Sequence, residues 1–235
     1  MTIAPAAAAP VAPDAVATGL VPLRLPPDLR LTPEQFALVC KANPDAVLEL
    51  AADGQLITMT PTGGETGARN SALAYQLAHW AHRHGGWKLF DSSCGFRLPD
   101  GSVLSPDASL VRLERWQALS PEQRRGFPPL CPDLVIELAS ASDQGPRGTE
   151  ALRRKMAAYQ SNGAQLGWLL FPEQRAVEIW RAVPRTSEAD VLPESGAAAP
   201  RHQPEDVMRL ENATLLDGGD LLPGLVLELE AIWAG

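Results

Sequence analysis

A carboxylate interrupts an apolar stretch of the chain, the segment 133–139 with the sequence DLVIELA. In a β-strand, alternation places Glu137 on one face with Val135 and Ala139, and the leucine and isoleucine side chains on the other face. Both faces are mostly apolar, which predicts a strand that is buried on both sides. A buried carboxylate needs a cation, a metal ion or several hydrogen-bond donors, because an uncompensated charge is costly there. Glu137 therefore indicates either a structural salt bridge to an arginine or a functional acid.

A second acid, Asp107, follows a proline in the sequence Ser105-Pro106-Asp107. Proline favours an extended conformation in the residue before it and lacks an N–H donor, so we expect Asp107 to open a strand over 107–112. Taken alone, a Pro-Asp pair is typical of a turn or of a strand edge. Its interest comes from Glu137, which lies downstream on the next predicted strand.

The third residue is Lys155, one of three lysines in a chain with 17 arginines. In the helix predicted around it, Leu152, Met156 and Tyr159 form an apolar stripe. Lys155 lies three residues after Leu152 and four before Tyr159, so it shares that inward face. Its stem could cover the core while the ammonium reaches water. The alternative is that the helix delivers the ammonium over the sheet toward Glu137.

Two carboxylates and a lysine suit the hydrolysis of a phosphodiester bond. If Asp107 and Glu137 lie on neighbouring strands, their oxygens can hold Mg²⁺ and leave coordination sites for water and a phosphate oxygen. Metal-bound water is more acidic than free water, and the charge of the ion offsets the charge that develops on the phosphate. Lys155 would orient or deprotonate that water, or stabilise the negative transition state.

The elements that would carry these residues follow from hydrophobic periodicity and from turn residues. Asp53-Gly54 predicts a hairpin turn, and Thr32 predicts a helix start. Strands are expected at 47–49, 56–59, 88–91, 96–98, 107–112, 133–139, 166–171 and 177–182, and the longer helices at 65–84 and 147–162. Helices that alternate with buried strands indicate an α/β or α+β domain built on a mixed sheet.

Composition divides the chain into one folded block and two loop-like segments. Residues 1–27, rich in alanine and proline, predict a flexible arm, and 184–206 predict a loop insertion. The remainder of 28–235 is expected to form a single domain, to which 207–235 add C-terminal strands and a short helix. The apolar segment 221–233 is a candidate interface for a homodimer.

We expect a cytoplasmic protein that does not enter a membrane. The three cysteines contain no CxxC pair, which is typical of a reducing compartment. No apolar run approaches the roughly 18 residues that a membrane helix requires. No lysine or arginine precedes Arg24, so the basic region of a secretory signal is missing.

The net charge of −8 leaves nucleic-acid binding open. Residues 184–235 contain 3 basic and 10 acidic side chains, so most of the acidic excess lies in this one region. Surface charge is screened within about 8 Å at physiological salt, and a distant acidic segment does not exclude a local phosphate site. The pairs Arg124-Arg125 and Arg153-Arg154 could contact phosphates or only line a solvated face.

Taken together, these residues resemble the PD-(D/E)XK nuclease superfamily and, more narrowly, the Uma-two family of restriction endonucleases. The similarity extends in order over most of the block 31–183. The matching segments are 59–67, 90–93, 95–99, 105–107, 131–138, 155–156 and 162–169.

The resemblance implies a restriction-endonuclease-like core, in which helices flank a mixed central sheet. It assigns Asp107 to the first acid of the motif and Glu137 to the second. It implies Mg²⁺ or Mn²⁺ as the cofactor, a nucleic-acid substrate, most simply DNA, and a homodimer as the assembly. Related nucleases often use another acid from the helix that contains Glu65, which makes Glu65 a further candidate metal ligand. The alternative for Glu65 is an acid that stabilises the helix N-terminus.

One position departs from the motif of this superfamily. The motif has a lysine two residues after its second acid, where this chain has Ala139, and a methyl group cannot activate water. Either Lys155 supplies the ammonium from the following helix, or the chain is catalytically impaired and uses a nuclease fold to bind nucleic acid or protein. A third interpretation is an oligomeric scaffold in which an arginine neutralises Glu137.

Overall fold

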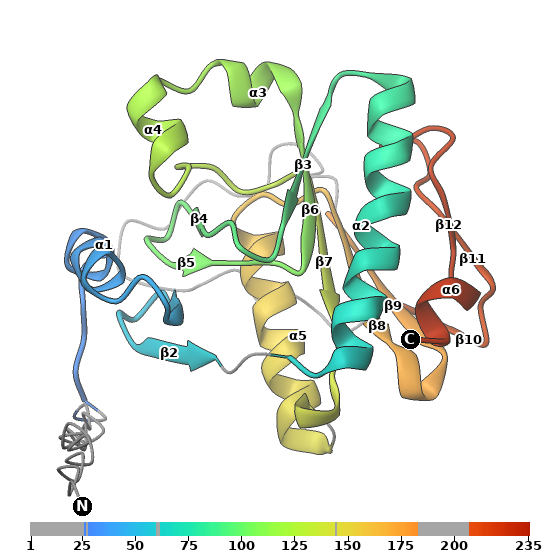
Figure 1. The fold of residues 1–235 in the computed structure, drawn as a ribbon, viewed down its shortest axis with the longest axis horizontal. Coiled ribbons are helices and arrows are strands. Elements are labelled where there is room, and N and C mark those ends of the chain that lie inside the picture. Colours follow the sequence, from blue (N-terminus) through green and yellow to red (C-terminus); the bar gives the residue numbers. More distant parts are fainter. Residues whose placement is uncertain (1–25, 27, 60–61, 144, 183–206) are drawn as a thin grey trace, which may run out of the picture.

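A six-stranded mixed sheet forms the centre of the molecule (Figure 1). The computed structural model describes residues 26, 28–59, 62–143, 145–182 and 207–235. The strands, in their order across the sheet, are β10 (Val207–Glu211), β9 (Ala176–Arg181), β8 (Leu166–Phe171), β7 (Leu134–Leu138), β6 (Ala108–Arg112) and β3 (Trp87–Asp91). Neighbouring strands are antiparallel, except for β7 and β8, which are parallel.

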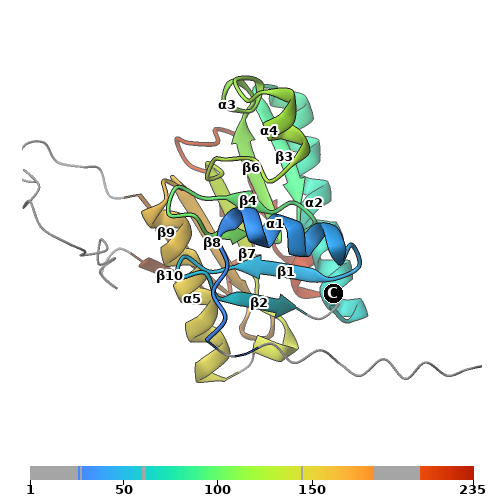
Figure 2. The same ribbon diagram turned by 90° about the vertical axis from the view of Figure 1, so that its left-hand side faces the viewer.

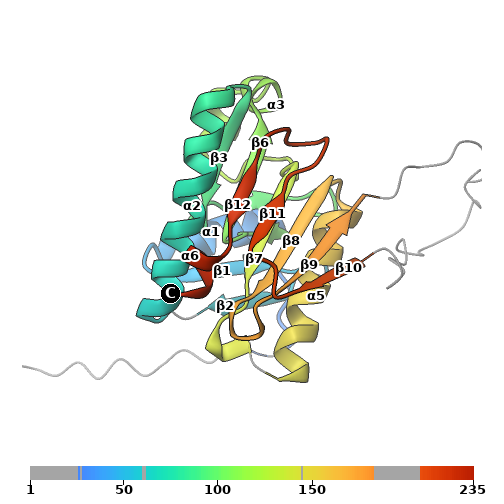
Figure 3. The same cartoon turned by 90° about the vertical axis from the view of Figure 1, so that its right-hand side faces the viewer.

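Helices cover both faces of this sheet, as the continuous apolar runs of its central strands predict. Every residue of β7 and β8 is buried. The helix α2 (Gly64–His84) lies on one face, together with a two-stranded sheet of β11 (Leu215–Asp217) and β12 (Val226–Glu228) and the short helix α6 (Glu230–Trp233) (Figure 3). The helix α5 (Pro146–Ser161) lies on the other face (Figure 1). The predicted fold class, a mixed sheet flanked by helices, is confirmed.

The parallel pair of β7 and β8 determines where α5 lies. Two adjacent parallel strands require a crossover connection over one face of the sheet, and α5 is the helix of that connection. Its apolar stripe is buried as predicted, with Met156 and Tyr159 fully enclosed. They share a core with Val135, whereas Leu134 and Ile136 belong to the core beneath α2. Residue 137 therefore faces α5.

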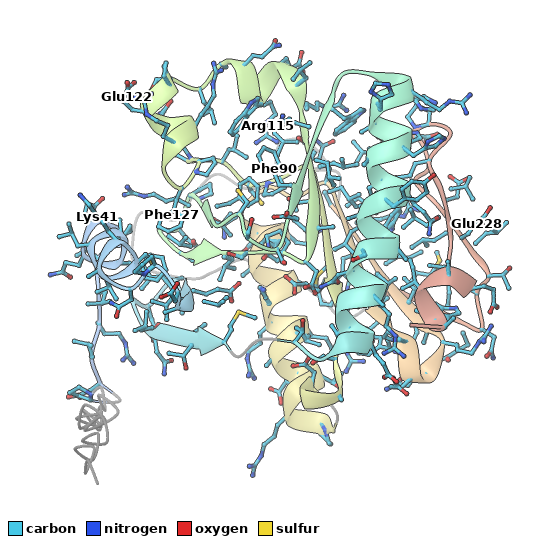
Figure 4. The ribbon with its side chains drawn as sticks, in the orientation of Figure 1. Lys41, Phe90, Arg115, Glu122, Phe127 and Glu228 are labelled. Atoms are coloured by element: carbon cyan, nitrogen blue, oxygen red, sulfur yellow. The ribbon has the colours of Figure 1, made fainter. Side chains whose placement is uncertain are left out.

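A smaller sheet adjoins the edge of the α5 layer (Figure 2). Its strands, in order, are β2 (Leu56–Met59), β1 (Val47–Leu50), β5 (Val103–Leu104) and β4 (Phe96–Arg97). The helix α1 (Pro33–Ala42) begins with the capping box of Thr32 and Gln35 that its sequence predicts. Phe36 of α1 packs on Phe127, labelled in Figure 4, with ring centroids 5.5 Å apart, and together with Leu50 and Val103 it forms a third core.

The remaining described elements are short. The polar segment between β6 and β7 contains α3 (Leu113–Gln117) and α4 (Pro121–Arg125), and single 3₁₀ turns occur at η1 (Ala141–Asp143) and η2 (Pro172–Gln174). None of the helices in the described ranges combines the length and the apolar character of a membrane span. The predicted loop 184–206 and, apart from residue 26, the predicted arm 1–27 lie outside the described residues.

Two expectations from the sequence are wrong in detail. The strand β6 begins at Ala108, so Asp107 directly precedes the strand rather than opening it. The segment 221–233 is mostly core rather than free surface, because its large apolar side chains other than Val226, which is 44% exposed, pack beneath α2. Those that are fully or almost fully buried are Leu222, Leu225, Leu227, Leu229 and Ile232.

Candidate active site

Glu137 is buried in the middle of β7 and is bound by two side chains of α5. The Lys155 Nζ lies 2.9 Å from its Oε1, and the Tyr159 hydroxyl donates a hydrogen bond of 3.1 Å to the same oxygen. Tyr159 follows Lys155 by four residues, so one face of α5 presents both groups to the strand. The cation at Glu137 is therefore an ammonium and not the arginine of the scaffold interpretation.

Lys155 does not extend to solvent, since its side chain is only 12% exposed. Its ammonium lies 2.8 Å from Oε1 of Glu49 and donates a hydrogen bond of 3.0 Å to the carbonyl oxygen of Ser105. With Glu137 this makes three oxygen partners, one for each N–H of the ammonium. The helix thus delivers a fully coordinated lysine to the sheet.

Asp107, the residue before β6, lies next to Glu137 of the neighbouring strand β7. Residues Ala108 and Ile136 are the last paired residues of β6 and β7, and one further step in this register places Asp107 opposite Glu137. The Leu138 N–H donates a hydrogen bond of 2.8 Å to Oδ2 of Asp107. The Asn70 amide of α2 donates one of 3.3 Å to Oδ1. The structure therefore brings Asp107, Glu137 and Lys155 together.

Acidic groups outnumber basic groups at this point. Burial raises the pKa of Glu137 to about 8, with the charges of Asp107 and Glu49 adding to the effect and Lys155 opposing it. Burial also raises the pKa of Asp107, against the Leu138 N–H and Lys155. Burial alone would lower the pKa of Lys155, but the carboxylates of Glu137 and Glu49 outweigh it and raise that pKa. The ammonium thus contacts two carboxyl groups, those of Glu137 and Glu49, and Asp107 is a third acid near them.

This donor set fits a hard divalent cation. Mg²⁺ is commonly held by one or two carboxylates, with water and substrate phosphate completing the shell. Asp107 and Glu137 provide two such groups, and a cation would offset the mutual repulsion that, with burial, opposes the ionisation of Glu137. Within the described part of the chain, no three His, Cys, Asp or Glu residues form a larger cage. The fit is thus to an ion that shares its coordination with water and substrate.

Glu65 lies away from this group. It is exposed in the first turn of α2, and Asn70, which contacts Asp107, is five residues further along the helix. Five residues rotate the helix by roughly 140°, so the two side chains leave it in different directions. Arg69, one turn beyond Glu65, pairs with Glu173 at 3.0 Å instead. The structure therefore does not bring Glu65 together with Asp107 and Glu137.

Sequence reasoning missed Glu49 and Asn70. Glu49 carries the same signal as Glu137, an acid between apolar neighbours in a short strand, here Leu48 and Leu50. The signal is weaker because the strand is short and has one exposed end. Asn70 gives no comparable signal, because a polar residue on a long helix is ordinary.

The other buried acids have structural partners. Asp133 accepts a hydrogen bond of 2.8 Å from the Arg112 N–H and pairs with Arg115 of α3, labelled in Figure 4, at 2.8 Å. Glu178 of β9 faces α5 two strands away from Glu137 and is bound by the guanidinium groups of Arg153 and Arg209. Arg153 is therefore a structural residue rather than a free phosphate contact.

Of the other arginines considered as phosphate contacts, each has a local partner. Arg154 pairs with Glu150 at 2.9 Å, and Arg125 pairs with Glu122 at 2.8 Å. Arg124 donates hydrogen bonds to the Leu119 and Gln117 carbonyl oxygens. These exposed pairs are typical of a solvated face.

Comparison with known proteins adds a family and a fold. A family model described as "Uma2: Putative restriction endonuclease" matches residues 33–227. Among solved structures, a putative nuclease belonging to DUF820 from Anabaena variabilis ATCC 29413 superposes with a TM-score of 0.61 at 16% identity, covering 87% of this chain and 98% of that chain. At that identity the likeness is one of fold. No curated protein matches the chain.

Proposed function

This chain belongs to the Uma2 family, described as putative restriction endonucleases, and we propose that it is a metal-dependent endonuclease that hydrolyses phosphodiester bonds, most readily those of DNA. The observation that carries the proposal is that Asp107 lies opposite Glu137 at the ends of β6 and β7, while the Lys155 ammonium of α5 contacts Glu137. These are the groups that phosphodiester hydrolysis requires: ligands for a divalent ion and a fixed positive charge.

Asp107 and Glu137 would hold Mg²⁺ or Mn²⁺, a cation that acidifies its bound water and offsets the charge developing on the scissile phosphate. The Leu138 N–H orients the Asp107 carboxylate, and the Tyr159 hydroxyl orients that of Glu137. Both carboxylates are thereby held before substrate arrives, so little reorganisation is required during the reaction.

Lys155 acts in this proposal as a charged donor rather than as a base. Because Glu137 and Glu49 raise the pKa of Lys155, the side chain keeps its proton at neutral pH. An ammonium cannot accept the proton of a water molecule. Its three N–H groups contact Glu49, Glu137 and the Ser105 carbonyl oxygen, so one of them becomes available to a phosphate oxygen or to the attacking water when Glu137 turns to the ion. The contribution of Lys155 is then the stabilisation of the negative transition state.

The test is relaxation of supercoiled plasmid by the purified full chain in Mg²⁺ or Mn²⁺. We expect nicking by the wild type, and a loss of roughly 100-fold or more in Glu137→Gln, since a metal ligand is removed. Glu178→Gln is the matched control, because Glu178 is also a buried strand acid facing α5. Equal nicking by the Glu137 and Glu178 variants, or none by any protein in either metal, would contradict the catalytic proposal.

A second function is favoured by Ala139, which stands where the motif has its lysine. In this alternative the chain binds nucleic acid or protein without cleaving it. Calorimetric titration of the metal-free protein with Mg²⁺ separates the two functions. The nuclease requires heat of binding that disappears in Glu137→Gln, whereas the binding module requires none that depends on the acids.

A further inference from the structure

Glu49 reaches the proposed site from the smaller sheet. It lies on β1, and its side chain is only 4% exposed. A single oxygen, Oε1, lies 2.8 Å from the Lys155 ammonium and also accepts a hydrogen bond of 2.8 Å from the Ser105 N–H. Lys155 in turn donates to the Ser105 carbonyl oxygen at 3.0 Å. The three residues form a closed ring directly before Pro106 and Asp107.

We propose that Glu49 is a positioning residue of this site, which holds the Lys155 ammonium beside the two metal-binding carboxylates. The inference rests on the proposed nuclease function and names a residue that acts through Lys155. A lysine needs such a support, because its ammonium is at the end of a flexible stem with four carbons. Burial without a second partner would leave it with Glu137 as its single anionic contact.

The need for a second anionic partner is greatest when Glu137 binds a cation. A divalent ion shared by Asp107 and Glu137 repels the ammonium and competes for the Glu137 oxygens. Glu49 belongs to the smaller sheet and is not one of the two proposed metal ligands. Its carboxylate can therefore keep Lys155 in place while Glu137 turns to the ion. The Ser105 peptide, which bonds both partners, fixes the ring to the segment that leads into Asp107.

Packing of the hairpin does not by itself explain a buried acid at this position. In the hairpin of β1 and β2, Val47 and Ile57 share the face of Glu49, since Glu49 is paired with Ile57 and Val47 is two residues away. They are 47% and 38% exposed. This face is therefore largely open to solvent at those two positions, whereas Glu49 is buried where it contacts Lys155 and the Ser105 N–H. The same contacts position the ammonium.

The chain suits a direct test by nuclear magnetic resonance. It has three lysines, and Lys41 and Lys88 are exposed whereas Lys155 is buried. In full-length metal-free protein labelled with ¹⁵N-lysine, a held and shielded ammonium gives a ¹H–¹⁵N signal at neutral pH, while exposed ammonium protons exchange with water. We expect one such signal, absent in Lys155→Met. It should broaden or disappear in Glu49→Gln and persist in Glu178→Gln.

Kinetics provide the second measurement. In plasmid nicking, Glu49→Gln should lower kcat by roughly 10- to 100-fold with a smaller change in KM, as expected for a group that orients a reacting residue. Glu49→Asp, which keeps the charge, should restore part of both kcat and the ammonium signal. An unchanged ammonium signal and kcat in Glu49→Gln would overturn the proposal.

Two further results are decisive. If Glu49→Gln melts below the assay temperature, both measurements are repeated at a lower temperature at which Glu49→Gln is folded. A signal and a kcat equal to those of Glu178→Gln then overturn the role. If the wild type cleaves nothing, the proposed nuclease function fails. The ammonium signal then still shows whether Glu49 holds Lys155.

Discussion

The carboxyl group of Glu137 is in an environment that favours its neutral form. Burial raises its pKa to about 8 from an ordinary value of 4.5, with repulsion from Asp107 and Glu49 in the same direction and Lys155 in the opposite one. The Tyr159 hydroxyl donates a hydrogen bond to Oε1 and, like Lys155, favours the ionised form, but burial is the largest effect. The folded protein without metal therefore keeps a proton on Glu137 over a pH range in which the unfolded chain has lost it.

This difference predicts that metal-free protein loses stability between about pH 4.5 and about pH 8. Since the folded state binds more protons in this window, the free energy of unfolding falls as pH rises, by at most about 1.4 kcal/mol per pH unit. Asp107, whose pKa is also raised, contributes with the same sign from a lower pH. Lys155 does not affect this slope, because its raised pKa makes stability depend on pH only above its ordinary pKa of 10.5.

Urea unfolding in a chelator at pH 5, 6, 7 and 8 measures the slope. Glu137→Gln should flatten it, because the amide does not titrate. A wild type and a variant with the same slope would show that Glu137 is ionised throughout this range.

At the scale of elements, α5 must lie close to the sheet for Lys155 to reach Glu137. Gly148, in the first turn of α5, determines how closely the start of this helix packs on η1, the turn that follows β7. A Cβ there would lie 2.4 Å from the carbonyl oxygen and 2.6 Å from the carbonyl carbon of Asp143, both backbone atoms. The turn η1 and the start of α5 are therefore in contact without room for a side chain.

Gly148→Ala should destabilise the protein by about 1–3 kcal/mol, because backbone must move to admit the methyl group. Gly67→Ala is the matched control. Gly67 lies inside α2 with nothing within 4 Å of its Cβ, and alanine there should stabilise by about 0.5–1 kcal/mol. Urea unfolding of both variants measures the difference. Equal effects of the two substitutions would refute the close contact.

The elements that sequence predicted well are those with a local pattern. The apolar run of β8 was predicted over 166–171 and is found at Leu166–Phe171, and the helix stripe of Met156 and Tyr159 is buried as its spacing requires. The Lys155 ammonium also lies beside Glu137, as one of the two interpretations of its position required. Helical spacing fixes which face carries a residue, and the crossover connection brings that face onto the sheet.

Features that depend on contacts between distant segments could not be read in the same way. Glu49 meets Lys155 because the hairpin approaches α5, and no spacing within the chain encodes that approach. Glu65 was expected among the acids because it lies on the correct helix, but the rotation of α2 turns Asn70 toward Asp107 instead. The resemblance pointed to Glu65 of α2, and in the structure the residue of α2 that contacts Asp107 is Asn70.

At the scale of the whole molecule, two sheets with separate cores meet at Lys155. Phe36 of α1 is fully buried and packs in one core with Leu50 of β1 and Val103 of β5. It thereby supports β1, the strand that carries Glu49. Ile232 is buried to the same degree in the core beneath α2, on the opposite face of the central sheet. These two residues allow the two sides of the molecule to be tested separately.

Phe36→Ala and Ile232→Ala should each lower stability by about 2–5 kcal/mol through cavity formation. Only Phe36→Ala should also broaden the ammonium signal of Lys155 under conditions where the protein is still folded. Melting curves and the lysine spectrum measure the two effects. Equal broadening in both variants would show that the smaller sheet has no special part in holding Lys155.

In the proposed site the amine comes from α5 rather than from β7, which changes what a search for related sites must look for. A one-dimensional pattern that demands lysine two residues after the second acid passes over this chain, because Ala139 stands there. Each residue of α5 adds about 100° of rotation. A one-residue insertion within α5 before Lys155 would therefore turn the amine away from Glu137. An insertion of about one helical turn would largely restore its direction. A three-dimensional search for similar sites should therefore match the direction in which the lysine leaves its helix, relative to the strand that carries the acid.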